Sequence, residues 1–142
     1  MPQVAETAVV EFRPDDTREA VVRLSFPARE GPDGIGTFNV EVEADGLKCE
    51  RAVLTLGGDG LDRFLMDLVN DWQGWNGIRR WDALENGMSI EATHHRNRVE
   101  LLFIVRRDYN PDAWEARLPI LVAPGESLAR LANAVADLLT VG

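Results

Sequence analysis

The stretch 37–56 places the strongest local constraint on the fold. Residues 37–44 alternate apolar and polar side chains, and residues 47–56 return after Asp45-Gly46. An Asp-Gly pair supplies the positive φ angles that a two-residue type I′ turn requires. The sequence therefore predicts a long antiparallel hairpin whose register is fixed by its turn.

The register of this hairpin sets its charged residues opposite one another. Glu43 faces Lys48, which is favourable, whereas Glu41 faces Glu50. Like charges directly opposite each other destabilise a sheet. Such a local cost suggests a useful acidic face, although carboxylates that splay into water would cost little.

Apolar periodicity predicts two helices. Over residues 61–72 apolar side chains recur at i, i+3, i+4, i+7 and i+11, and Asp59 precedes them as an N-cap. A second helix follows Pro124-Gly125-Glu126, with an apolar stripe from Leu128 to Leu139. Residues 78–85 are interpreted as one short helical turn.

Strands account for most of the remaining chain. Residues 99–106 are apolar on both faces, which is typical of a central strand. Pro119 cannot donate a ladder hydrogen bond, so its strand, 114–122, is expected at a sheet edge. The other predicted strands are 9–12, 18–26 and 88–93, with 27–36 as a loop.

This order of elements predicts an α+β fold with one antiparallel sheet of six or seven strands and both helices packed on one face. No linker divides the chain, so residues 1–142 are expected to form one domain.

Composition restricts the partners and the compartment. The formal net charge of −9 disfavours nucleic acid and anionic membranes and favours a basic partner. Cys49 is the single cysteine, which suits a reducing compartment. No secretory signal and no membrane span are predicted, so we expect a cytoplasmic protein.

No residue pattern predicts a catalytic set, a cofactor or a metal site. His94 and His95 are adjacent, so on a strand they would point to opposite faces. The glycine-rich turn at 57–60 lacks the lysine and hydroxyl of a phosphate loop. Cys49 is expected to be a small buried hydrophobe. Glu41 and Glu50 resemble an acid–base pair, but no sugar-binding cleft can be inferred.

Three of the four tryptophans fall within residues 72–81. Trp72 and Trp81 continue apolar stripes and are expected in the core. Trp75 stands between glycines, where burial is harder, and is predicted to be available for recognition. On the polar arc of the helix at 61–72, Met66 lies between acidic residues as a candidate apolar contact.

One run of residues supports a family resemblance. Asp71-Trp72-Gln73-Gly74-Trp75-Asn76-Gly77 is followed by Trp81 and by Leu84-Glu85. This "DWxGWxG…W…LE" pattern resembles a family of small uncharacterised bacterial proteins over residues 38–139. His94-His95-Arg96-Asn97 departs from the Asp and Gly expected there. The layout also resembles immunity proteins that neutralise toxins delivered between competing bacteria.

We therefore predict a non-enzymatic binding protein, with an immunity protein that neutralises a basic toxin domain as the preferred hypothesis. Its acidic surface would steer the partner and a few anchors would hold it. The alternative is a small enzyme or ligand-binding protein with a pocket beside the tryptophan-rich segment. The predicted partner-binding residues are Glu41, Glu43, Glu50, Asp62, Met66, Asp67 and Trp75.

Overall fold

The computed structural model describes residues 8–16, 19–29, 35–108 and 110–140, without the side chains of 27–29 and 140. The expected absence of a secretory signal concerns mainly residues 1–7, which lie outside the described residues. The predicted loop at 27–36 is too long, because residues 27–29 and 35–36 belong to strands; residues 30–34 lie outside the described residues.

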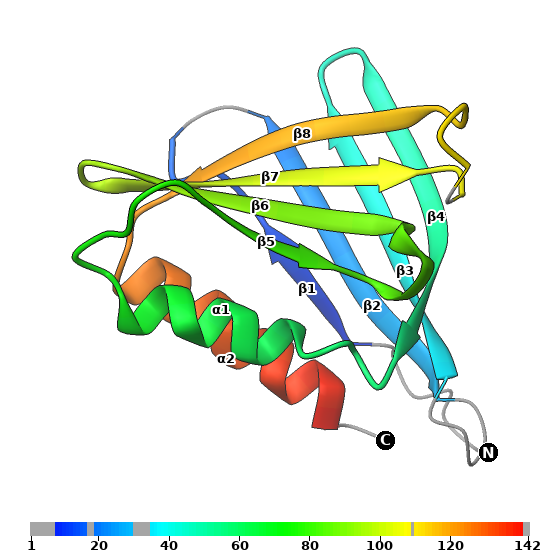
Figure 1. The fold of residues 1–142 in the computed structure, drawn as a ribbon, viewed down its shortest axis with the longest axis horizontal. Helices are drawn as coiled ribbons and strands as arrows, with labels where there is room; N and C mark the ends of the chain where they lie inside the picture. Colours follow the sequence, from blue (N-terminus) through cyan, green and yellow to red (C-terminus); the bar gives the residue numbers. More distant parts are fainter. Residues whose placement is uncertain (1–7, 17–18, 30–34, 109, 141–142) are drawn as a thin grey trace, which may run out of the picture.

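The chain runs twice through four strands followed by a helix (Figure 1). The first half contains β1 (Val9–Phe12), β2 (Ala20–Arg29), β3 (Ile35–Ala44), β4 (Leu47–Leu56) and α1 (Leu61–Asn70). The second half contains β5 (Ile78–Asp82), the 3-10 turn η1 (Leu84–Asn86), β6 (Met88–His95), β7 (Arg98–Arg106), β8 (Glu115–Val122) and α2 (Glu126–Thr140).

The class α+β is correct, but the prediction of one sheet is wrong. Strands β1 to β4 form one antiparallel sheet in sequence order, sheet A, and β5 to β8 form a second, sheet B. Each sheet has one apolar face, and the two faces cover each other. The helices contact the sheets mainly through α2, which packs against β1 and β2. They pack against each other at the side of the sandwich where β1 and β5 lie (Figure 1).

The core lies between the two sheets. Phe12 of β1 and Phe103 of β7 meet edge to face, with ring centroids 5.0 Å apart. Helix α1 adds Leu61, Leu65 and Leu68, all fully buried in the same cluster. Burial of such side chains contributes about 1.5–3 kcal/mol each, so this shared cluster is the main force that holds the layers together.

The hairpin prediction is confirmed in detail. Strands β3 and β4 pair with Glu43 opposite Lys48 and Glu41 opposite Glu50, around a turn at Asp45-Gly46. The φ of Gly46 is 77°, as this turn requires. Two further expectations also hold. Strand β7 is central in sheet B, and β8, which contains Pro119, is an edge strand.

The segment around α1 differs from the prediction. The helix ends at Asn70, so Trp72 lies beyond it and is 55% exposed, and its predicted core position is wrong. Trp81 is buried as predicted, but on a strand rather than a helical turn. Asp59 is not the N-cap, because Gly60 occupies that position without a side-chain hydrogen bond.

Asp59 instead connects the two halves of the chain. Its carboxylate accepts hydrogen bonds from the amide of Leu56 at the end of β4, at 3.2 Å, and from the amide of Leu84 in η1, at 2.9 Å. Its backbone carbonyl accepts the indole N–H of Trp81 at 3.0 Å. The Asp59 carboxylate therefore pairs with the amides of Leu56 and Leu84, and not with the first amides of helix α1 as an N-cap would.

Candidate protein-binding surface

The predicted hairpin glutamates lie on the outer face of sheet A. The inward positions of β3 hold Phe38, Val40 and Val42, so the alternating residues Glu41 and Glu43 point to solvent. Glu50 of β4 lies directly opposite Glu41. The structure therefore brings these three carboxylates together on one rigid surface.

Arg23 of β2 partly neutralises this surface. Its guanidinium lies 2.9 Å from Glu11, 3.5 Å from Glu41 and 3.4 Å from Glu43. Hydrogen bonds from Arg13 and Arg23 lower the pKa of the Glu11 carboxyl. Sequence reasoning missed this cation, although the alternation in residues 20–26 places it outward, because its neighbours depend on the β2–β3 pairing.

Glu50 has no such compensation. Among the described residues, no cation lies within ion-pair distance of the Glu50 carboxylate. Likewise, none of their carboxylates lies within that distance of the Lys48 ammonium. Arg23 thus lies beside only one member of the Glu41–Glu50 pair, and Glu50 is left as its uncompensated carboxylate.

The predicted residues on α1 lie elsewhere. Asp67 is exposed, Asp62 is half-buried, and Met66 is half-buried and packs against the core. Figure 1 shows α1 on the far side of the molecule from the β3–β4 turn. The structure thus does not gather the helix residues and the hairpin glutamates into one patch.

Trp75 has several intramolecular contacts. Its indole N–H donates to the carbonyl of Ala92 at 3.2 Å, and the side chain packs against the core. The Arg79 guanidinium lies 4.9 Å from its ring centroid, and the His94 ring meets it edge to face at 5.3 Å. Trp75 therefore ties the segment after α1 to β6, a role that the sequence prediction did not include.

The two histidines do not form a shared site. His94 donates from Nε2 to the carbonyl of Trp72 at 3.1 Å, and His95 is exposed at the end of β6. Gly74 is in contact with the His94 ring: a Cβ there would lie 3.2 Å from Nδ1. The His94 ring thus serves to hold the turn at 71–77 in place.

A hollow of about 660 Å³ lies beside this segment, between α1 and β5. Its polar lining includes Asp71 and Arg79, which form an ion pair at 2.7 Å, and Arg80. Both arginines of this lining already form ion pairs, Arg79 with Asp71 and Arg80 with Asp82. A ligand carboxylate would therefore have to compete with these acids.

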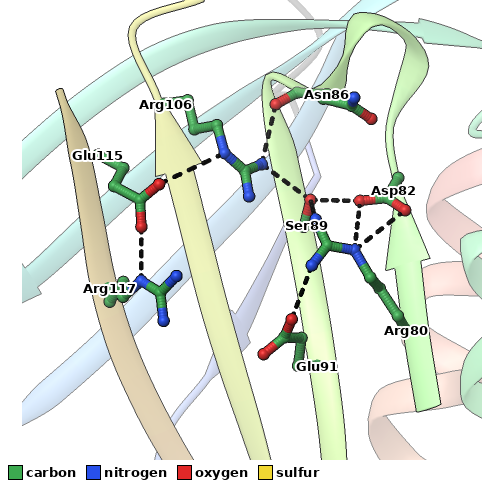
Figure 2. Close-up of polar contacts among 8 residues, drawn as sticks. All are labelled: Arg80, Asp82, Asn86, Ser89, Glu91, Arg106, Glu115 and Arg117. Atoms are coloured by element: carbon green, nitrogen blue, oxygen red, sulfur yellow. Dashed lines mark hydrogen bonds and ion pairs between the residues drawn. The ribbon is translucent and has the colours of Figure 1, made fainter. Parts of the chain in front are cut away.

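A second polar cluster, centred on the fully buried Ser89, covers the outer face of sheet B (Figure 2). The Ser89 hydroxyl donates to Asp82 at 2.5 Å and accepts from Arg106 at 2.9 Å and Arg80 at 3.2 Å. Both lone pairs and the proton of this hydroxyl are thus engaged. A serine nucleophile needs access to substrate as well as a base, and the fully buried Ser89 lacks that access.

The cluster continues across the sheet as alternating charges (Figure 2). Arg80 contacts Glu91 at 2.7 Å, while Arg106 lies 3.6 Å from Glu115, which Arg117 contacts at 2.5 Å. The hydrogen bond from Arg117 lowers the pKa of the Glu115 carboxyl below its ordinary value. These ion pairs form a charged cover over the outer face of the sheet.

The remaining candidates for chemistry are weak. Cys49 lies opposite Val42 as predicted, but it is half-buried rather than buried. Partial burial raises the pKa of its thiol, which lowers the thiolate fraction at neutral pH. No group of three His, Cys, Asp or Glu side chains within the described ranges could hold a metal ion. None of the helices in these ranges is long and apolar enough to cross a membrane.

The family DUF6228, described as a family of unknown function, matches residues 13–142. The chain belongs to this family. The match confirms the resemblance to an uncharacterised family, and neither the tryptophan motif nor the immunity-protein layout is part of that finding. No curated protein and no solved structure matches the chain.

Proposed function

We propose that this DUF6228 protein acts by binding another protein, and that it is an immunity protein whose partner is a basic toxin domain. The observation that carries the proposal is the exposed acidic face of the β3–β4 hairpin, held in fixed register by ten paired positions. Immunity of this kind requires occlusion of a partner and no chemistry of its own.

The charge balance of this face supports a basic partner. Among the described residues of β2 to β4 and the hairpin turn, this face holds two cations, Arg23 and Lys48, and the four carboxylates of Glu41, Glu43, Asp45 and Glu50. Complementary charge raises association rates over the neutral range of about 10⁵–10⁶ M⁻¹s⁻¹. A rigid sheet also loses little conformational entropy on binding, which favours affinity.

The test is co-expression with the products of the genes adjacent to the one that encodes this chain. We expect one product to be toxic alone, harmless in the presence of this protein, and bound to it as purified proteins. If no neighbouring product is both toxic and bound, the immunity proposal is wrong.

A charge-reversal variant tests the surface itself. Glu41→Lys, Glu43→Lys and Glu50→Lys together should slow association with that product by about tenfold or more and weaken its salt dependence. A matched control reverses Glu85, Asp112 and Glu126, which are exposed and carry the same charge outside the predicted binding residues. Equal association rates for the two triple variants would contradict the assignment of the hairpin face.

A second candidate is a small-molecule binder, favoured by the hollow of about 660 Å³ beside the tryptophan-rich segment. Its polar lining fits a small zwitterionic or carboxylate-bearing compound that displaces the Asp71–Arg79 ion pair. Thermal-shift measurements with amino acids and dicarboxylates test it. A shift that is lost in Arg79→Gln would support this function.

A further inference from the structure

The four edge strands of the two sheets are unequally protected. Helix α2 packs beside β1, and the Arg79–Asp71 ion pair links the short β5 to the end of α1. On β8, Pro119 has no N–H, and the carbonyl of Leu121 accepts the amide of Asp15 at 3.0 Å. Strand β4 has ten residues; η1 packs beside it and Arg51 donates to the carbonyl of Arg107, but residues 47–50 have no covering helix, ion pair or added backbone partner among the described residues. Long open edges are sites for pairing with another chain.

Hairpin geometry shows which backbone groups of β4 are available. A two-residue turn makes Ala44 and Leu47 a hydrogen-bonded pair, and such pairs then alternate along the ladder. Lys48 and Glu50 therefore direct their N–H and C=O groups away from β3. Neither residue has another backbone partner in the described part of the chain.

The side chains on this edge are self-complementary. Lys48 and Glu50 are both exposed, two residues apart, and without an ion-pair partner among the described residues. When a strand pairs with its own copy across a two-fold axis, residue i meets residue j and j meets i. Centred on Cys49, an antiparallel pairing sets each Lys48 opposite the partner's Glu50.

A groove of about 630 Å³ lies along the same edge, between β4 and the strand β8. Half of its lining residues are apolar or nearly so (Leu47, Cys49, Trp114 and Ala116), and half are charged (Lys48, Glu50, Glu115 and Arg117). Trp114 is 47% exposed there. In the pairing centred on Cys49, this groove lies beside its counterpart in the second copy, so the pairing removes part of both linings from water.

We propose that two copies of this chain associate through antiparallel pairing of β4 with β4, so that the two A sheets become one continuous sheet. The backbone groups of Lys48 and Glu50 form the new ladder, two Lys48–Glu50 pairs set its register, and Cys49 lies at the two-fold axis. Each copy carries a net charge of −9, so the association is weak and depends on this local complementarity.

The test is analytical ultracentrifugation of the full chain from micromolar to millimolar concentration. Lys48→Glu and Glu50→Lys each replace two opposite-charge pairs with two like-charge pairs, so each should raise the dimer dissociation constant about tenfold or more. The double variant exchanges the two charges and should restore dimerisation. The double variant also keeps one favourable and one unfavourable charge pair within the hairpin. The favourable pair is then at positions 41 and 50, and the unfavourable pair at positions 43 and 48.

This design separates local pairing from general repulsion. Glu50→Lys changes the net charge by two units from −9 to −7, and Lys48→Glu changes it by two units to −11. General repulsion would make the first variant dimerise more strongly, whereas the proposal requires both to dimerise less. Asp67→Lys gives the same −7 on α1 and serves as the matched control, with no loss of dimer expected.

Cross-linking provides the second measurement. Residues at a non-hydrogen-bonded antiparallel pair have Cα atoms about 4.5 Å apart, which is within disulfide range. A mild oxidant should therefore link Cys49 to the partner's Cys49, and Lys48→Glu should suppress the product. A chain that stays monomeric throughout the concentration range, or a dimer that neither charge variant weakens, would overturn the proposal.

Discussion

Replacement of Trp81 is expected to be among the most destabilising single changes in this protein. The side chain is 6% exposed and belongs to the core between the sheets, and its indole N–H donates to the carbonyl of Asp59. Truncation of a buried tryptophan to alanine costs about 3–5 kcal/mol. Loss of the hydrogen bond adds about 1 kcal/mol.

The effect is large relative to the stability of a domain, about 5–15 kcal/mol. With a urea dependence of about 2 kcal/mol/M, Trp81→Ala should lower the unfolding midpoint by about 2 M. The measurement is urea unfolding followed by far-ultraviolet circular dichroism, because the substitution removes a fluorophore.

Trp72→Ala is the matched control for this prediction. Trp72 is 55% exposed and lies after the end of α1, so its removal should change the free energy of unfolding by no more than about 0.5 kcal/mol. Trp81→Phe keeps most of the apolar volume and reports mainly on the hydrogen bond. If the two alanine variants are equally unstable, the assignment of Trp81 to the core and Trp72 to the surface is wrong.

Three further changes can be measured in the same way. Ser89→Ala should cost about 1–3 kcal/mol in unfolding free energy, because it leaves the buried polar groups around it with one partner fewer. Gly58→Ala should destabilise more than Gly57→Ala: both have positive φ, but only at Gly58 would a Cβ meet Leu139, at 2.6 Å. Glu115→Gln should lower stability at neutral pH by less than about 1 kcal/mol, since the group is partly exposed. Because the folded-state pKa of Glu115 is lowered, the wild-type advantage should disappear as pH falls through that pKa.

The sequence predicts best what is encoded locally. The Asp45-Gly46 turn fixes the β3–β4 register through dihedral requirements and alternation within twenty residues. Pro119 marks an edge strand because it lacks a donor. The division into two sheets is not local in this sense. Strand 99–106 is apolar on both faces, and the sequence does not show whether helices or a second sheet cover them. In the structure one face packs against sheet A, and Ile104 is buried on the outer face, among the charged side chains.

The site residues show the same limit. Glu41 and Glu50 were placed correctly because their pairing follows from the turn. The compensating Arg23 was missed because its contacts depend on how β2 meets β3. Trp72 was misplaced because the apolar stripe continues past the point where the helix ends, and the end is set by the backbone turn at 71–74.

The distribution of paired charges shows which carboxylates a basic partner could use. Many of the arginines already contact an acid: Arg13, Arg23, Arg79, Arg80, Arg106, Arg107 and Arg117. The excess of acidic over basic residues therefore resides in carboxylates such as Glu50 that lack a cation among the described residues.

A basic partner would have to displace Arg23 in order to contact Glu41 or Glu43, but it would meet Glu50 without competition. Glu50 is also the residue that the pairing of β4 with β4 would engage. The two proposed interactions therefore draw on the same carboxylate, and by linkage each should weaken the other. If both occur, a basic partner bound to the hairpin face should dissociate the dimer, and the monomer would be the form that binds it.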